Sequence, residues 1–247
     1  MPGSKLAPRS NAAASIVTEG RRALSALADP AVRAGGERYF KGVIPFIGVK
    51  APVVRRVARD LVARHRTMEI ETLVQAALTL LRQPHMEEKQ LGIVMLERLA
   101  RRWPPTLLDD IDRMFDDVTN DWATCDAIAG RLIHPMMQRD ARIAARMVRW
   151  SKGAHPWRQR AAAVAFVKSA RRGAHNATIL AICHQLAQRD DRFVQLGMGW
   201  VLRELSQADR DAVIAFLRDH DSIIRREAFR YATEKMPAHV RPCRTTS

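Results

Sequence analysis

The sequence predicts an all-α protein built from repeated helix pairs, and three observations lead to that prediction. The composition is rich in Ala, Leu and Arg, which favour helices, and poor in Tyr and Phe. No segment alternates apolar and polar residues for long, so we expect no strands. From residue 67 onward, short breaks containing Pro, Gly, Asn or Asp divide the chain into helical lengths.

The N-terminal third contains the least regular part of the pattern. We expect a first helix over residues 15–27, which Asp29-Pro30 ends, and a second helical run that carries Tyr39-Phe40-Lys41 and ends near Pro45. The apolar stretch 45–52 predicts a tight loop with a turn at Gly48. A helix then opens at Ala51, with proline in its first turn where proline is tolerated, and runs to about Arg66.

The remaining helices repeat along the chain. We expect breaks at residues 83–85, 103–105, 120, 134–135, 153–156, 173–176, 190–191, 208–209 and 220–221. Similar helices start at Glu87, Trp122, Trp157, Phe193 and Ile223, and the first four starts are about 35 residues apart. This period is typical of paired-helix solenoids, in which each pair needs its neighbours to bury its apolar face. The sequence therefore predicts a curved solenoid of antiparallel HEAT-like helix pairs, an α-α superhelix, whose second helices line the concave side.

Length and charge set further limits. The 247 residues, 47% of them apolar, are enough for one repeat domain, which we place at residues 15–238, between a disordered segment 1–14 and a basic tail 239–247. The formal net charge of +15 indicates a polyanionic partner.

No stretch is long and apolar enough to span a membrane, and the N-terminus has no secretory signal. The three cysteines form no CxxC pair and the histidines show no metal-site spacing, so we expect a cytosolic protein without a metal site.

The stretch from Asn120 to Pro135 contains a pair of residues that points to a surface. Trp122 and Asp126 are four residues apart and so share one face of a helix, which Asn120 or Asp121 can cap. A carboxylate beside an indole is an unfavourable core pair, because a buried unpaired charge costs several kcal/mol. The alternative is an ordinary repeat helix with Trp122 packed inward and Asp126 solvated.

Four segments, taken in order, resemble the AlkD-type DNA alkylation repair enzymes, a family of DNA glycosylases built from HEAT-like repeats. They are YFKGVIPFIGVKAPVVRR from Tyr39, NDWATCDAI from Asn120, WRQRAAAVAFVK from Trp157 and GWVLREL from Gly199. The resemblance extends from about residue 39 to residue 235. In the family an aromatic residue often precedes the first tryptophan, whereas this chain has Asp121, whose role the sequence does not assign.

The resemblance implies a role for each matching position. Asp126 is expected to be the catalytic carboxylate, and Trp122 and Trp200 to pack against the sugar and backbone of the lesion nucleotide. Arg160 is expected to hold a DNA phosphate, Tyr39 to take the place of the cleft tyrosine, and Lys168 and Arg203 to be basic groups facing the DNA. The implied function is release of cationic alkylated purines from duplex DNA, without base flipping and without a cofactor or metal, by a monomer in a bacterial-type cytosol.

Two other functions account for the repeats and the charge. One is a non-catalytic HEAT-like protein that binds damaged or branched DNA, and the other is a scaffold for protein interactions. Neither explains why Trp122, Asp126, Arg160 and Trp200 occur together.

Overall fold

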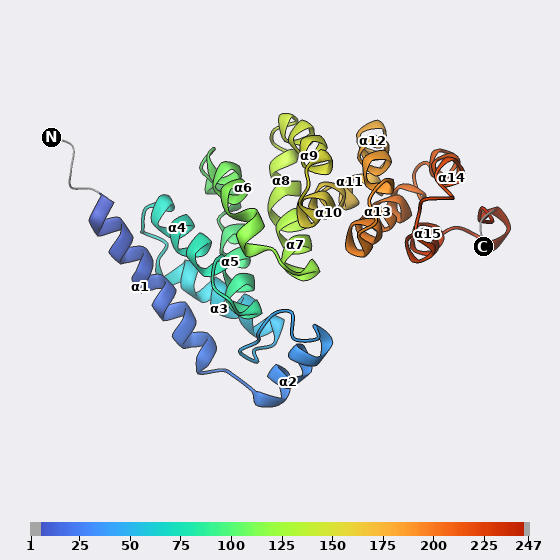
Figure 1. Ribbon diagram of the computed structural model, residues 1–247. Helices are drawn as coiled ribbons and strands as arrows, with labels where there is room; N and C mark the ends of the chain where they lie inside the picture. Colours follow the sequence, from blue (N-terminus) through green and yellow to red (C-terminus); the bar gives the residue numbers. More distant parts are fainter. Residues whose placement is uncertain (1–5, 245–247) are drawn as a thin grey trace. The chain divides into compact units, whose positions relative to one another are not determined.

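The computed structural model describes residues 6–244, and these residues form helices and loops without any strand (Figure 1). The all-α prediction is therefore confirmed. By their contacts the helices group into two compact units, residues 1–127 and 128–247. The single repeat domain expected over residues 15–238 stays a prediction.

The first unit is built around α5, which α3, α4 and α1 contact. Leucine and methionine side chains on these helices are fully buried, and removing them from water supplies the main driving force for packing. The helices are α1 Leu6–Ser25, α2 Pro30–Tyr39, α3 Ala51–Arg64, α4 Ile70–Leu81, α5 Met86–Arg98, the 3-10 turn η1 Ala100–Arg102, α6 Leu107–Val118 and α7 Trp122–Ile128.

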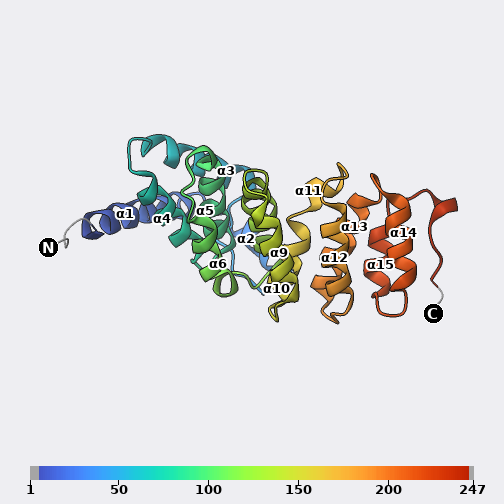
Figure 2. The same cartoon turned by 90° about the horizontal axis from the view of Figure 1, so that it is seen from above.

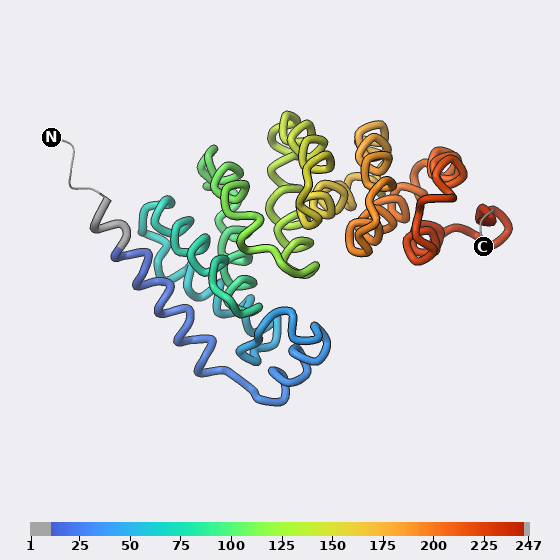
Figure 3. Tube along the Cα trace, viewed as in Figure 1, coloured from blue at the N-terminus to red at the C-terminus, as the bar shows by residue number. Residues whose placement is uncertain are grey.

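The second unit repeats a pair of helices, as Figures 1 and 2 show. The second helices α10, α13 and α15 pack on one another in that order, while the first helices α9 and α12 pack side by side. Figure 3 follows the chain through these helices as a tube. The elements are the π-helical turn η2 Ala129–Ile133, α8 His134–Met137, α9 Arg142–Lys152, α10 Pro156–Val164, α11 Val167–Ala170, α12 Asn176–Ala187, α13 Arg192–Leu205, α14 Arg210–Asp219, α15 Arg226–Thr233 and η3 Ala238–Val240.

The loop between α2 and α3 is as tight as its sequence predicts. Gly48 has φ of 104°, and a Cβ atom there would lie 2.3 Å from the Asp29 carbonyl oxygen, so glycine is needed on both counts. The Asp29 N–H donates to the Gly48 carbonyl at 2.9 Å, and the Asp29 carboxylate caps α2. Pro52 lies in the first turn of α3, as expected.

The expected start of the first helix is wrong. α1 begins at Leu6 rather than Ser15, so residues 6–14 are helical and not the irregular segment that the sequence predicts. The run Ala12-Ala13-Ala14 has the highest helix propensity, and Ala13, Ile16 and Val17 are buried in the first unit. The rest of the expected disordered segment, residues 1–5, lies outside the described residues.

The break expected at His134-Pro135 is also wrong. The helix that begins at Trp122 continues to Met137 and passes through proline by widening into a π turn at residues 129–133. The His134 N–H donates to the Ala129 carbonyl, five residues back, instead of the usual four. A proline lacks an N–H and crowds the preceding turn of an α-helix, and the wider turn accommodates both effects.

Part of the basic C-terminal tail is bound to the second unit. Arg241 Nε donates to the Met236 carbonyl at 2.8 Å, and an Arg244 Nη donates to the Asp221 carbonyl at 2.8 Å. The segment 241–244, part of the expected basic tail 239–247, is thereby held on the second unit. Residues 245–247 lie outside the described residues.

Candidate nucleic-acid interface

Trp122 belongs to an aromatic cluster within the first unit. The Phe40 ring stacks on the indole with a centroid distance of 5.3 Å and an interplanar angle of 12°. Tyr39 meets the same indole edge-on at 6.2 Å, and Phe46 lies against Phe40 at 5.4 Å. Each aromatic pair of this kind contributes roughly 0.5–1.5 kcal/mol beyond burial. Trp122 is half-buried and Tyr39 is 69% exposed, so the cluster presents aromatic surface to solvent.

Local backbone features place the two phenylalanines. Phe40 is the C-cap of α2, after which the chain turns back through Lys41 and Gly42, both with left-handed φ, at 52° and 74°. Phe46 rests on Gly36 of α2, where an added Cβ would come within 2.6 Å of the ring. Glycine at residue 36 therefore lets the loop lie close enough to the helix for Phe46 to support Phe40.

A buried carboxylate holds the loop that carries Phe46. Glu87 of α5 is 2% exposed and accepts hydrogen bonds from three successive backbone N–H groups, those of Ile47, Gly48 and Val49, at 2.8, 2.9 and 3.0 Å. Hydrogen bonds to an ionised acceptor are stronger than neutral ones. Glu87 therefore joins α5 to the loop that carries Phe46 of the aromatic cluster.

Asp121 is the N-cap of α7. Its Oδ1 accepts from the Thr124 N–H at 2.8 Å, and the residue is 2% exposed. This confirms the expected cap and supplies the role that the sequence left unassigned. Trp122 is the first residue of the helix, and Asp126 follows one turn later as a half-buried carboxylate.

Lys89 binds the end of α6, just before the start of α7. Its buried ammonium donates to the Val118 carbonyl at 2.8 Å, at the last residue of α6, three residues before Asp121. Burial lowers the pKa of Lys89, while the charges of Asp121 and Glu88 oppose that shift. The neighbouring Glu88 accepts from Arg21 Nε of α1 at 2.6 Å. In this run, Glu87 thus binds the loop, Glu88 binds α1, and Lys89 binds the end of α6, just before α7.

In the second unit, Arg160 lies in the contact between α10 and α13. It is 6% exposed, and one Nη donates to the Phe193 carbonyl at 2.7 Å. Gly197 makes room for the side chain, since a Cβ there would approach the Arg160 Cγ to 3.0 Å. Arg160, the residue expected to hold a DNA phosphate, is therefore packed within the fold, and its hydrogen bond to the Phe193 carbonyl orients the guanidinium.

The other expected residues of the second unit differ in their surroundings. Lys168 is exposed and donates to the Gly130 carbonyl, inside the π turn, at 3.1 Å. Trp200 is a half-buried residue of α13, next to Gly199, where α13 approaches the backbone of Ala228 in α15.

Arg203 is already engaged by acidic groups. It donates to Glu234 at 2.6 Å and to Glu204 at 3.0 Å, and its guanidinium lies 4.6 Å from the Tyr231 ring centroid. Its side chain is only 17% exposed. These contacts give Arg203 a structural role in holding α15 on α13, so its contact with DNA stays a prediction.

The structure thus brings Tyr39 and Trp122 together in the first unit, with Asp126 on the same helix as Trp122. In the second unit, Arg160, Trp200 and Arg203 lie on the packed pair α10 and α13. The residues that the sequence does not reveal are Phe40, Phe46, Glu87 and Lys89. The partners of Phe40, Glu87 and Lys89 lie 29 or more residues away in the sequence, and Phe46 is held by the same loop that Glu87 binds.

Within residues 6–244, no group of three or more His, Cys, Asp or Glu side chains is arranged to hold a metal ion. Over the same described part of the chain, no helix combines the length and apolar character needed to cross a bilayer.

Comparison with known proteins identifies the family. The family of DNA alkylation repair enzymes matches residues 21–236. Among solved structures, the fold is similar to that of a protein described as a predicted DNA alkylation repair enzyme from Enterococcus faecalis, with a TM-score of 0.76. The two chains are 16% identical, and the match covers 85% of this chain and 97% of that one, a likeness that concerns the fold alone. No curated protein matches this chain. Because the family match spans most of the sequence, the chain belongs to the family of DNA alkylation repair enzymes.

Proposed function

We propose that the protein is a DNA glycosylase that hydrolyses the N-glycosidic bond of cationic alkylated purines in duplex DNA. One observation carries the proposal: α7 begins with Trp122 stacked on Phe40 and carries the Asp126 carboxylate one turn later. A negative charge beside an exposed aromatic surface suits a positively charged sugar-like transition state.

The chemistry requires little help from the protein. A purine alkylated at N3 or N7 carries a positive charge and leaves as a neutral base when the bond from its nitrogen to C1′ breaks. The sugar left behind resembles an oxocarbenium ion. In the proposal, Asp126 stabilises that cation and orients the water that adds to C1′, and the water loses a proton to the carboxylate or to solvent.

The other residues have supporting roles in the proposal. Trp122 and Trp200 offer aromatic faces to the lesion nucleotide, and Tyr39 extends the aromatic surface of the first unit. Arg160, oriented by its hydrogen bond to Phe193, is assigned a phosphate contact, and Lys168 adds positive charge. Phosphate contacts of this kind set the register on DNA without reading the base sequence.

The proposal does not require the damaged base to enter a pocket. The resemblance to the family implies that the lesion is engaged through its sugar and backbone, so that selectivity arises from the weakness of its glycosidic bond. Most enzymes that act on bases instead rotate the base out of the duplex.

The decisive experiment measures base release from methylated duplex DNA by the wild type and by Asp126→Asn. The substitution keeps the shape and removes the charge, and we expect release to slow by about 100-fold or more, the usual contribution of a positioned carboxylate. Asp117→Asn, at an exposed position near the end of α6, is the matched control and should keep the wild-type rate.

Thermal unfolding of both variants shows whether the fold is retained. If the wild type and Asp126→Asn release base equally slowly while both bind the duplex, the protein is a DNA-binding member of the family without glycosylase activity, and the proposal fails.

A further inference from the structure

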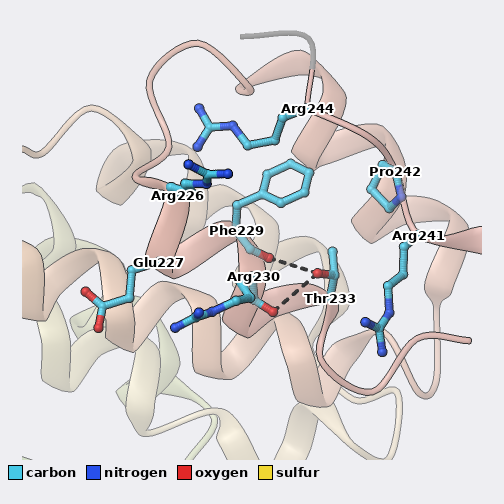
Figure 4. A pocket seen from close by; sticks show the side chains of 8 residues that line it. All are labelled: Arg226, Glu227, Phe229, Arg230, Thr233, Arg241, Pro242 and Arg244. Carbon is cyan, nitrogen blue, oxygen red and sulfur yellow. Dashed lines mark hydrogen bonds between the residues drawn. The ribbon is translucent and has the colours of Figure 1, made fainter. Parts of the chain in front are cut away.

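The second unit contains a basic pocket that the proposed chemistry does not use. It lies between α15 and the C-terminal segment and has a volume of about 940 Å³ (Figure 4). Arg226 and Arg230 come from α15, while Arg241 and Arg244 come from the segment after η3. We call this hollow the C-terminal arginine pocket.

The pocket carries an excess of positive charge. Glu227 is the one carboxylate among its lining residues, and it is engaged from outside the pocket by Arg192, whose Nη2 and Nε donate to it at 2.6 and 2.8 Å. These hydrogen bonds lower the pKa of Glu227 and keep it ionised. Arg244 is balanced by Asp221 at 3.1 Å. The remaining charge is therefore that of Arg226, Arg230 and Arg241.

Two of the arginines are held in place by the fold. Arg241 donates to the carbonyls of Met236 at 2.8 Å and Glu234 at 3.1 Å. Arg244 lies 5.6 Å from the Phe229 ring centroid in addition to its contacts with Asp221. A side chain that is fixed before binding loses less conformational entropy when a ligand arrives.

The other two arginines, Arg226 and Arg230, are exposed. The Arg230 carbonyl accepts from the Thr233 hydroxyl, and the charge of Arg230 helps to lower the pKa of Glu227. Within residues 6–244, neither guanidinium forms a hydrogen bond with another side chain. Figure 4 shows the Arg226 side chain near Arg244 and the Arg230 side chain extending toward Glu227. A guanidinium presents a fork of N–H donors that matches the oxygens of a phosphate group.

The shape of the surface favours an extended ligand. A second hollow of about 480 Å³ shares Glu227, Arg230 and Arg241 with the pocket and is also lined by Glu234, whose carboxylate accepts from Arg203 at 2.6 Å. Arginine side chains therefore line a path longer than a single phosphate. Small-molecule sites are mostly apolar and enclosed, whereas this surface is open and rich in guanidinium groups. A strand of nucleic acid presents one negative charge at each step along its backbone.

We propose that the C-terminal arginine pocket binds the phosphodiester backbone of a DNA strand, as a contact separate from the residues proposed for catalysis. The inference rests on the proposed function only in taking DNA as the partner. It extends the DNA-binding surface of the second unit to its last helix and to the segment after it.

The test compares the double variant Arg226→Gln/Arg230→Gln with the double variant Arg210→Gln/Arg218→Gln. The second pair removes the same charge from exposed positions on α14, outside the pocket. Binding to undamaged duplex DNA is measured by fluorescence anisotropy from about 50 to about 200 mM salt. We expect the pocket variant to reduce the slope of log K against log salt by about 1.8, the loss of two phosphate contacts, and the control to keep the wild-type slope.

Two results would overturn the inference. One is a pocket variant with the same slope as the control. The other is a rise in the melting temperature of the wild type with inorganic phosphate or a mononucleotide, lost in the pocket variant, while the DNA slope stays unchanged; the pocket would then be a small-anion site. Because the duplex is undamaged, the measurement does not depend on base release, so failure of the proposed function and failure of this inference are distinguishable.

Discussion

At the scale of single residues, carboxylates in this protein are used in contrasting ways. Glu87 and Asp121 are buried and accept hydrogen bonds from backbone N–H groups, and they thereby fix the conformation of a loop and of a helix start. Asp126, half-buried on the same helix as Trp122, is the carboxylate to which we assign chemistry. The sequence alone distinguishes these roles only through the resemblance to a family.

Glu87→Gln tests whether one side chain supports the loop under the aromatic cluster. A glutamine amide has one acceptor oxygen and no charge, so the N–H groups of Ile47, Gly48 and Val49 lose part of their hydrogen bonding in a buried place. We expect the free energy of unfolding to fall by about 2–4 kcal/mol, measured by chemical denaturation.

The control for this variant is Glu71→Gln, in the exposed first turn of α4, which should change the free energy of unfolding by less than about 0.5 kcal/mol. Equal stability of the two variants would mean that Glu87 does not hold the loop.

At the scale of helices, small residues decide how closely the repeats approach. A Cβ at Gly92 of α5 would lie 2.4 Å from the Ala77 carbonyl oxygen and 2.9 Å from the Leu81 nitrogen, both backbone atoms of α4. The helices cannot move apart without loosening the leucine core between them.

Gly92→Ala should therefore lower the free energy of unfolding by about 1–3 kcal/mol through overpacking. Gly35→Ala, in α2, is the matched control, because a Cβ there meets nothing within 4 Å. That substitution should raise stability by roughly 0.5–1 kcal/mol through helix propensity alone. Urea denaturation of the two variants measures both effects, and a stabilised Gly92→Ala would show that the helix pair is less closely packed than described.

Most of the helix pattern could be predicted from sequence because it depends on local signals, whereas the positions expected for the site come from the resemblance to a family and stay predictions. Pro52 in a first turn, Gly48 in a loop and the recurring helix starts need no knowledge of the fold. The stack of Phe40 on Trp122 joins residues 82 positions apart, and the buried Glu87-Glu88-Lys89 run has the pattern of a solvated helix start. Such features depend on tertiary contacts, which periodicity does not report.

At the scale of the whole molecule, charge is the feature that connects sequence and function. The net charge of +15 matches a family that acts on DNA, and the second unit gathers part of it in the C-terminal arginine pocket. In the proposed function, positive charge of this kind supplies affinity for any duplex rather than choice of lesion.

If the lability of the lesion provides the selectivity, adducts with and without a positive charge should differ widely in rate. We expect release of 3-methyladenine or 7-methylguanine to be at least about 100-fold faster than release of the neutral base hypoxanthine from the same duplex, since each 1.4 kcal/mol of barrier is a factor of ten. Single-turnover assays on matched oligonucleotides measure both rates. Comparable rates for charged and neutral bases would show that the protein reads the base itself.

The π turn before Pro135 has a consequence for how this stretch tolerates changes of length. The wide turn accommodates one residue more than an α-helical turn, so the residues after it are rotated by about 100° relative to an uninterrupted helix. Deleting one residue between Ala129 and Ile133 would close the wide turn against Pro135 and at the same time turn Met136 and Met137 away from the interior where they are buried. Such a deletion would thus crowd the proline and misdirect the side chains, which ties the irregular turn and the proline to each other.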